Sequence, residues 1–212
     1  MRILHTADWH VGRTLARKSR LEEMRAVLAE VVDIAVREEV EVVVLAGDVY
    51  EHQAPSAEAE QVVFDVLLAL ERAGIAVVIV AGNHDHPGRW RALTPLLRRL
   101  SVNVVSHPVR PRDGGVVELE GRAGDRLQVA CLPWIYERRL TGSAELMGLE
   151  GEVFQSYAEG MAGLLRGICR DLDPDACTVL ASHLYVSGAT VGKEGDRTER
   201  GLTIGELYAV PP

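Results

Sequence analysis

Four groups of polar side chains follow apolar segments of the sequence, at positions where strands would end. They are Asp8-Trp9-His10, Gly47-Asp48, Gly82-Asn83-His84-Asp85 and Ser182-His183. Carboxylate, imidazole and amide oxygen suit Mn²⁺, Fe²⁺ or Zn²⁺, and the absence of cysteine from these groups argues against a thiolate site. Because ligand sites in open α/β sheets form beyond the carboxyl ends of the strands, the four groups predict one metal site.

Each group by itself also has a structural explanation. An isolated Asp-x-His or Gly-Asp is commonly part of a turn, and an isolated histidine such as His183 is commonly a hydrogen-bonded structural residue. The tetrapeptide at 82–85 is more specific, since three successive polar side chains cannot all face a core. The occurrence of all four groups at strand ends favours the metal site over four unrelated turns.

The first half of the chain alternates predicted strands and helices. Short apolar segments predict strands at 3–7, 42–46, 75–81 and 102–105, and helical periodicity or a basic helical segment predicts helices at 21–38, 55–74 and 89–100. Alternating strands and helices indicate a largely parallel sheet covered by helices.

The second half has a different pattern. Segments 116–120 and 127–132 flank a turn at 121–125 and predict an antiparallel hairpin. A helix is expected at 152–172, where Gly160, Gly163 and Gly167 indicate close packing. A further core strand is predicted at 178–181, and a loop at 187–205.

Length and composition indicate a folded, globular protein. The chain has 212 residues, of which 47% are hydrophobic and 25% charged, so we expect one domain, or one large domain with an appendage, that has a substantial core. Its longest apolar run falls well short of the roughly 18 residues that a membrane span needs. Three cysteines without Cys-x-x-Cys spacing argue against a disulfide framework. These features predict a cytoplasmic protein with no membrane association.

The charge is unevenly distributed along the sequence. With 23 basic and 31 acidic residues the net charge is −8, which by itself argues against a nucleic-acid partner. However, residues 11–21 and 86–112 contain arginine and lysine but no acid. Both segments follow predicted metal-ligand groups directly, so we expect them near the metal site, where they could hold phosphates.

The four groups together resemble the signature of the calcineurin-like metallophosphoesterases. Other segments resemble the SbcD nuclease subunits of bacterial SbcC–SbcD DNA-repair complexes, and this similarity extends over nearly the whole chain. The segments are 1–13, Ala46-Gly-Asp-Val-Tyr, Pro55-Ser-Ala-Glu-Ala, Cys131-Leu-Pro-Trp, 182–189 and the region around Glu199-Arg200. The resemblance implies a layered α/β/β/α sandwich with a mixed, mostly parallel central sheet.

The resemblance also implies a binuclear metal centre. By the family pattern, Asp8 and His10 bind one cation, Asn83 and His183 bind the other, and Asp48 bridges both. Mn²⁺ is the expected metal. Two cations that share a bridging carboxylate polarise one phosphodiester and activate a water molecule.

Two further residues receive catalytic roles from the resemblance. His84 would contact the phosphate, stabilise developing charge and protonate the leaving oxygen. Asp85 would orient His84, although it is equally suited to cap the helix that follows.

One family motif is missing from this sequence. The family completes its metal site with a Gly-His-x-His motif shortly after the region of Tyr208, but the chain ends at Pro212 and its seven histidines include no such pair. The resemblance therefore predicts that residues 1–212 form a nuclease core truncated at its C-terminus. Each metal would lack one imidazole ligand, and the DNA-capping and ATPase-binding regions would be absent.

The implied function is a metal-dependent DNA exonuclease and endonuclease that acts on DNA ends and hairpins in double-strand-break repair and recombination. Candidate DNA-binding residues are Arg13, Arg17, Arg89, Arg91 and His52, with ordinary solvent-exposed side chains as the alternative. Trp9 and Trp90 could stack on bases or pack in the interior. We expect His5 to be a core hydrogen-bonding residue.

The resemblance also implies partners. These are DNA, an SbcC-type coiled-coil ATPase and a second copy of the chain. Apolar residues at 62–70 and 96–100 are candidates for the dimer face, with burial against the sheet as the alternative. Two other functions remain open: a metallophosphatase acting on a small molecule or phosphoprotein, which would leave the basic segments unexplained, and a non-catalytic dimerisation module.

Overall fold

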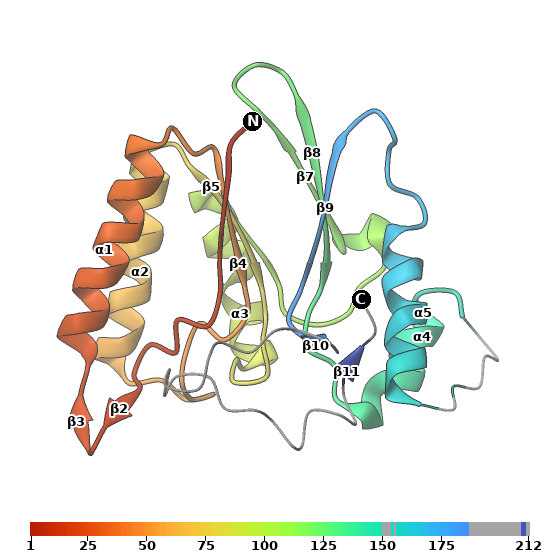
Figure 1. The fold of residues 1–212 in the computed structure, drawn as a ribbon, viewed down its shortest axis with the longest axis horizontal. Helices are drawn as coiled ribbons and strands as arrows, with labels where there is room; N and C mark the ends of the chain where they lie inside the picture. The colour runs from red at the N-terminus through yellow and green to blue at the C-terminus, as the bar shows by residue number, and fades with distance from the viewer. Residues whose placement is uncertain (150–153, 155, 187–208, 211–212) are drawn as a thin grey trace.

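The computed structural model describes residues 1–149, 154, 156–186 and 209–210, and these form a sandwich of four layers (Figure 1). Two β-sheets face each other, and helices cover the outer face of each sheet. The predicted loop at 187–205 and the Glu199-Arg200 region lie outside the described residues. No helix in the described part of the chain is long and apolar enough to cross a membrane.

The first sheet is parallel, as the first half of the sequence predicts. Its strand order is β1-β4-β5-β6. The strands are β1 (Ile3–Thr6), β4 (Val42–Ala46), β5 (Ala76–Val80) and β6 (Val102–Val105). Strands buried on both faces are nearly continuous apolar runs, and all five residues of β4 are buried.

Three helices cover the outer face of this sheet. They are α1 (Leu21–Arg37), α2 (Ala57–Arg72) and α3 (Pro87–Leu97), and α3 continues into the short helix η1 (Arg98–Leu100). The helix α2 begins after Ser56, whose side chain accepts a hydrogen bond from the Ala59 amide. The α2 residues proposed for a dimer face are buried against the sheet, so burial is the correct interpretation for Val62, Val63, Val66, Leu67 and Leu70.

The second sheet is mixed. Its strands, in the order β7-β8-β9, are β7 (Val116–Glu120), β8 (Arg126–Leu132) and β9 (Cys177–Ser182). β7 and β8 form the predicted antiparallel hairpin, whereas β9 runs parallel to β8. The strand predicted at 178–181 is present, but only one of its faces lies in the core. In β9, Ala181 is buried and Val179 is partly buried in the core between the sheets, whereas Leu180 is 46% exposed.

Two helices pack on the outer face of the second sheet, α4 (Leu140–Leu146) and α5 (Tyr157–Cys169). The helix α5 is shorter than the helix expected at 152–172. It begins after Ser156, whose side chain caps the helix by accepting a hydrogen bond from the Glu159 amide. The predicted close packing is confirmed: a Cβ at Gly160 would overlap Leu140, and one at Gly167 would lie 3.0 Å from the Met147 Cβ.

Apolar side chains between the two sheets form a shared core. Strands β4 and β5 contribute Val42, Val44, Val78 and Val80, and the second sheet contributes residues such as Val129. The layered α/β/β/α sandwich is therefore confirmed, although its parallel and mixed strands lie in two separate sheets.

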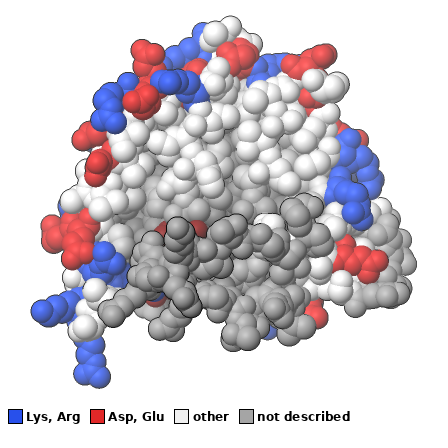
Figure 2. Space-filling model, viewed as in Figure 1, with Lys and Arg blue, Asp and Glu red and all other residues white. Residues whose placement is uncertain are grey.

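The remaining elements are short. They are β2 (Thr14–Leu15), β3 (Lys18–Ser19), η2 (Pro111–Asp113), η3 (Glu137–Arg139), β10 (Tyr185–Val186) and β11 (Ala209–Val210). β2 and β3 form a hairpin with basic side chains that projects from the body of the molecule (Figures 1 and 2). Its turn residues, Ala16 and Arg17, both have positive φ angles.

Candidate metal centre

The four polar groups come together at one edge of the sandwich. Asp8, Asp48 and Asn83 follow the carboxyl ends of three neighbouring parallel strands, and His183 follows β9 of the opposite sheet. Together they line a pocket of about 470 Å³. The described residues around it are His5, Ala7, Asp8, His10, Ala46, Asp48, Asn83, His84, Trp134, Ser182, His183, Leu184 and Tyr185.

The backbone at the pocket is in an unusual conformation. Asp8, His10 and Asp48 have φ angles of 55°, 46° and 52°, in a left-handed region that costs a non-glycine residue about 1–3 kcal/mol. Hydrogen bonds between the two loops hold this conformation, from the Asp8 amide to the Gly47 carbonyl (3.0 Å) and from the His10 amide to the Asp48 carbonyl (2.9 Å). Strain of this kind is typical of functional sites, where it directs side chains toward a ligand.

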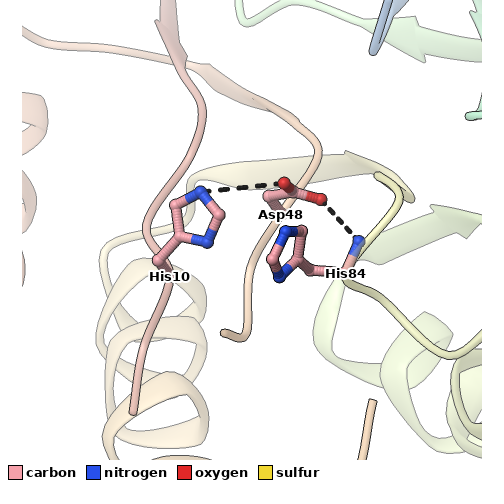
Figure 3. Close-up of side chains that lie close together, drawn as sticks. All are labelled: His10, Asp48 and His84. Carbon is pink, nitrogen blue, oxygen red and sulfur yellow. Dashed lines mark hydrogen bonds and ion pairs between the residues drawn. The ribbon is translucent and has the colours of Figure 1, made fainter. Parts of the chain in front are cut away.

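Asp48 lies at the centre of the cluster, and its side chain is 5% exposed. Its Oδ2 is 3.7 Å from His10 Nε2 and 3.5 Å from His183 Nε2. Its Oδ1 accepts a 2.9 Å hydrogen bond from the His84 amide (Figure 3). Asp48 belongs to two sets of potential metal-ligating atoms, one with His10 and His84 and one with Asp8 and His183.

Asn83 and His183 meet across the gap between the sheets. The Oδ1 of Asn83 lies 3.2 Å from Nε2 of His183. The other ring nitrogen of His183, Nδ1, lies 2.9 Å from the Ala46 carbonyl, which can only accept. Nδ1 therefore donates its proton there, so Nε2 is the ring nitrogen directed at the cluster, an arrangement common for metal-binding histidines.

Two glycines leave room for these contacts. A Cβ at Gly47 would overlap the ring of His183, and a Cβ at Gly82 would overlap the carboxylate and backbone of Asp48. Gly47 also has a φ of 93°, which L side chains rarely adopt. The glycines in the Gly-Asp and Gly-Asn-His-Asp groups are therefore needed for the close approach of these segments.

The contacts within the cluster shift the pKa values of His10, Asp48 and His183. Hydrogen bonding to Asp8 raises the pKa of His10 against the opposing effect of burial, with help from Asp48 and Glu51. Burial opposes protonation of His183, but Asp48 and the Ala46 carbonyl outweigh it and raise its pKa to about 9. For Asp48, burial alone would raise the pKa. The contacts with His183 and with the His84 amide outweigh burial, so the pKa of Asp48 is lowered.

This donor set suits divalent cations. Imidazole nitrogens and carboxylate and amide oxygens converge, and the buried carboxylate of Asp48 is shared between two sets of atoms. The carboxylates of the cluster favour positive charge on His10 and His183, and they would favour the positive charge of a bound cation in the same way. The residues therefore fit the metal centre that the sequence predicts.

Glu51 is a site residue that the sequence analysis missed. Its Oε2 lies 3.0 Å from Nδ1 of His10, and its backbone carbonyl lies 2.6 Å from Nδ1 of His84. The rings of His10 and His84 also contact each other edge to face, with centroids 4.9 Å apart. Glu51 therefore orients two histidines from different loops. Its position three residues after Asp48 is the one available signal in the sequence.

Asp85 has different partners from those expected. Its carboxylate accepts hydrogen bonds from the amides of Gly82 (2.9 Å), Val49 (3.4 Å) and Tyr50 (3.4 Å). Burial raises its pKa, partly offset by these amides. Asp85 thus ties the loop after β4 to the loop after β5. The orienting contact of His84 comes from the Glu51 carbonyl, and the N-cap of α3 is His86.

The basic candidates lie in different environments. Arg13 and Arg17 are exposed on and beside the β2–β3 hairpin, and Arg91 is exposed on α3. Arg89 forms an ion pair with Glu60 of α2. His52 is exposed and does not line the pocket of the metal centre. The structure brings none of these five side chains into that pocket.

The aromatic residues and His5 are placed partly as predicted from the sequence. Trp9 and Trp90 are buried, which confirms the packing alternative. The prediction for His5 is wrong, because it is exposed and lines the pocket. The sequence analysis missed the aromatic wall formed by Trp134 and Tyr185, whose ring centroids lie 5.6 Å apart.

Known proteins resemble this chain along most of its length. The calcineurin-like phosphoesterase family profile matches residues 1–140. The chain is 34% identical over 212 residues to the SbcD component of the nuclease SbcCD from Bacillus subtilis, covering 99% of this chain and 52% of that protein. It is 34% identical over 227 residues to the SbcD component of the same nuclease from Rhodobacter capsulatus, covering 100% of this chain and 54% of that protein.

The chain thus spans about half the length of these curated relatives. Among solved structures, a dimetal phosphatase from Danio rerio matches with a TM-score of 0.47 and 14% identity, over 87% of this chain and 69% of that one.

Proposed function

Because this chain belongs to the calcineurin-like phosphoesterase family, we propose that it is the core of an SbcD-type nuclease that hydrolyses DNA phosphodiesters with the help of divalent metal ions. The observation that carries the proposal is the cluster around Asp48, where side chains from four segments converge in one pocket. The similarity to two SbcD proteins supports DNA as the substrate.

In the proposed metal centre, Asp8 and His10 would hold one cation, and Asn83 and His183 would hold the other. The carboxylate of Asp48 would be shared by the two cations, because it belongs to both sets of potential ligand atoms, one with His10 and His84 and one with Asp8 and His183. When bound, the cations supply Lewis-acid polarisation of the phosphodiester and a nucleophilic water at neutral pH. We propose Mn²⁺ as the metal because the family resemblance implies it; the mixed donor set of carboxylate, imidazole and amide groups suits Mn²⁺, Fe²⁺ and Zn²⁺ alike.

His84 is the proposed catalytic residue. Its Nδ1 donates to the Glu51 carbonyl, so the ring orientation is fixed and Nε2 is left for the substrate. A protonated Nε2 stabilises negative charge on the phosphate and gives its proton to the leaving oxygen. Asp85 acts indirectly as a positioning residue, because it joins the loops that carry Asp48 and His84.

The biological setting is part of the proposal. We propose that the protein acts at DNA ends and hairpins in the cytoplasm during repair and recombination, as a homodimer and with a coiled-coil ATPase. Its relatives are each named as one component of the nuclease SbcCD, which supports an assembly with a second kind of chain.

The test compares three substrates in the presence of Mn²⁺: end-labelled duplex DNA, bis-p-nitrophenyl phosphate and p-nitrophenyl phosphate. We expect a version extended past Pro212 through the Gly-His-x-His motif to cleave the DNA and the diester. His84→Ala should lower kcat by about 10²–10⁴-fold, the usual contribution of a general acid. Calorimetry should show that His84→Ala still binds as much Mn²⁺ as the wild type, because His84 is not a proposed ligand.

The other outcomes are informative. Hydrolysis of the monoester alone would replace the nuclease proposal with a phosphatase. Loss of Mn²⁺ binding in His84→Ala would make His84 a metal ligand, in line with its place beside His10 and Asp48.

A further inference from the structure

A second pocket, of about 430 Å³, lies beside the metal centre. The two pockets share Trp134 as a wall. The hydroxyl of Tyr136 donates a 3.2 Å hydrogen bond to the carbonyl of Asn83, a proposed metal ligand. The position of this second pocket is thus fixed relative to the metal centre.

The walls of this pocket are basic and come from both halves of the sandwich. Arg91 belongs to α3, which covers the first sheet, whereas Arg138 and Arg139 belong to η3, which follows the second. In contrast to Arg89, which pairs with Glu60, none of these three guanidinium groups forms an ion pair with a carboxylate in the described part of the chain. The Arg138 guanidinium lies 5.4 Å from the centre of the Tyr136 ring.

Little negative charge opposes these arginines. Asp85 is the one carboxylate among the described residues that line the pocket, and it already accepts hydrogen bonds from three backbone amides. His107 also lines the pocket, and burial together with Arg91 lowers its pKa. A net positive pocket of this kind attracts an anion.

The basic surface continues beyond this pocket. A third pocket of about 270 Å³ shares Arg91, Ser106 and His107 with it and is also lined by Arg98 and by one carboxylate, Asp113. Because each pocket shares lining residues with the next, the three pockets lie next to one another, and together they form a track that leads from the metal centre past Arg138, Arg139 and Arg91 to Arg98. A track with several cations along it suits a polyanion better than a single phosphate ion.

We propose that this track, bounded by Arg91 on α3 and by Arg138 and Arg139 on η3, binds the phosphate backbone of the DNA strand that enters the metal centre. The inference depends on the proposed function and adds a substrate-binding surface to it. Guanidinium groups on opposite walls contact phosphates, so the track holds the strand without reading its sequence. It requires both halves of the sandwich, because α3 belongs to the first half and η3 to the second, and each contributes one wall.

The test measures binding of a fluorescein-labelled DNA duplex by fluorescence anisotropy. EDTA prevents metal-dependent cleavage and separates the track from the cations. Arg91→Gln/Arg138→Gln removes one cation from each wall. Arg72→Gln/Arg122→Gln is the matched control, since both of its arginines are exposed and lie where strands β5 and β8 begin, at the opposite edge of the sheets.

We expect the Kd of Arg91→Gln/Arg138→Gln to rise by about tenfold. The slope of log Kd against log salt concentration should fall by about one for each lost phosphate contact. The control pair should change the Kd by less than about twofold, because distant exposed charges are screened. Equal effects of the two double variants would overturn the proposed track but leave the nuclease proposal intact. Failure of the wild type to bind DNA would overturn both.

Discussion

The parallel sheet supplies Asp8, Asp48 and Asn83 to the candidate metal centre, whereas the mixed sheet supplies His183 and part of the wall around it. In the first sheet, three loops leave neighbouring strands and are hydrogen-bonded to one another. His183 instead reaches the cluster from the other side of the interior, through contacts with Ala46 and Asn83. The first half thus forms most of the centre locally, and the second half completes it only if the two sheets pack correctly.

The largest expected effect comes from the residue that joins both sets of ligands. Asp48→Asn keeps the shape of the side chain but removes its charge. We expect the affinity for Mn²⁺ to fall by about a hundredfold or more, because each set of ligands loses its shared carboxylate. Isothermal titration calorimetry measures this, with the exposed Asp33→Asn on α1 as the control. Unchanged Mn²⁺ affinity in Asp48→Asn would remove Asp48 from the centre.

Next in size are matched truncations in the two halves. Leu67 on α2 and Leu164 on α5 are both completely buried, in the separate clusters on the two outer faces. We expect Leu67→Ala and Leu164→Ala each to lower the free energy of unfolding by about 2–5 kcal/mol. Both should unfold in a single transition in urea, because the core between the sheets couples the halves.

Two separate transitions in either leucine variant would contradict this coupling. His183 would then belong to a half that can unfold while the rest of the centre remains folded.

A glycine substitution should weaken the contact between the halves more selectively. A Cβ at Gly47 would overlap His183, whereas a Cβ at Gly74 meets no atom within 4 Å, although both glycines have positive φ. Both Gly47→Ala and Gly74→Ala should lose about 1 kcal/mol of stability from the strained backbone. Only Gly47→Ala should also lose about tenfold in Mn²⁺ affinity, because it displaces His183. Equal Mn²⁺ affinities of the two variants would show that His183 is dispensable.

The smallest expected effect is at the opposite edge of the sandwich. The amino group of Met1, which precedes β1, lies 2.7 Å from Oδ2 of Asp125 in the β7–β8 turn. Hydrogen bonding between them lowers the pKa of Asp125 and raises that of the Met1 amino group. Because the Asp125 pKa is depressed on folding, its contribution is present above the ordinary value of 3.8 and is lost as the pH falls through its folded value.

For the Met1 amino group, the sign is reversed. Its contribution is fully present below the ordinary pKa of 8.0 and disappears as the pH rises through its folded value. The Tm of the wild type should therefore slightly exceed that of Asp125→Asn between about pH 4 and 8, and the difference should shrink on both sides. A difference that does not vary with pH would exclude the ion pair as its cause.

Local pattern was enough to predict the parallel sheet and the hairpin. The apolar run at 42–46 and the glycine-containing turn at 121–125 specify their elements through interactions between near neighbours. It was only partly right for β9: Ala181 lies in the core, but nothing in the apolar segment at 178–181 indicates that Leu180, on the other face, is 46% exposed. The prediction for His5 failed for a related reason. The alternation of side chains along a strand shows which residues share a face of the sheet, but whether that face is buried depends on the segments that pack against it.

The sequence by itself determined which chemical groups the centre could contain. Asp8, His10, Asp48, Asn83 and His183 stand at strand ends, and their donor types already favour a divalent cation. Tertiary structure alone decided how they meet: the three positive φ angles, the Glu51 contacts to two histidines and the Gly47 contact with His183. Residue type sets what a side chain can bind, but contacts between segments far apart in the chain depend on how the two sheets pack.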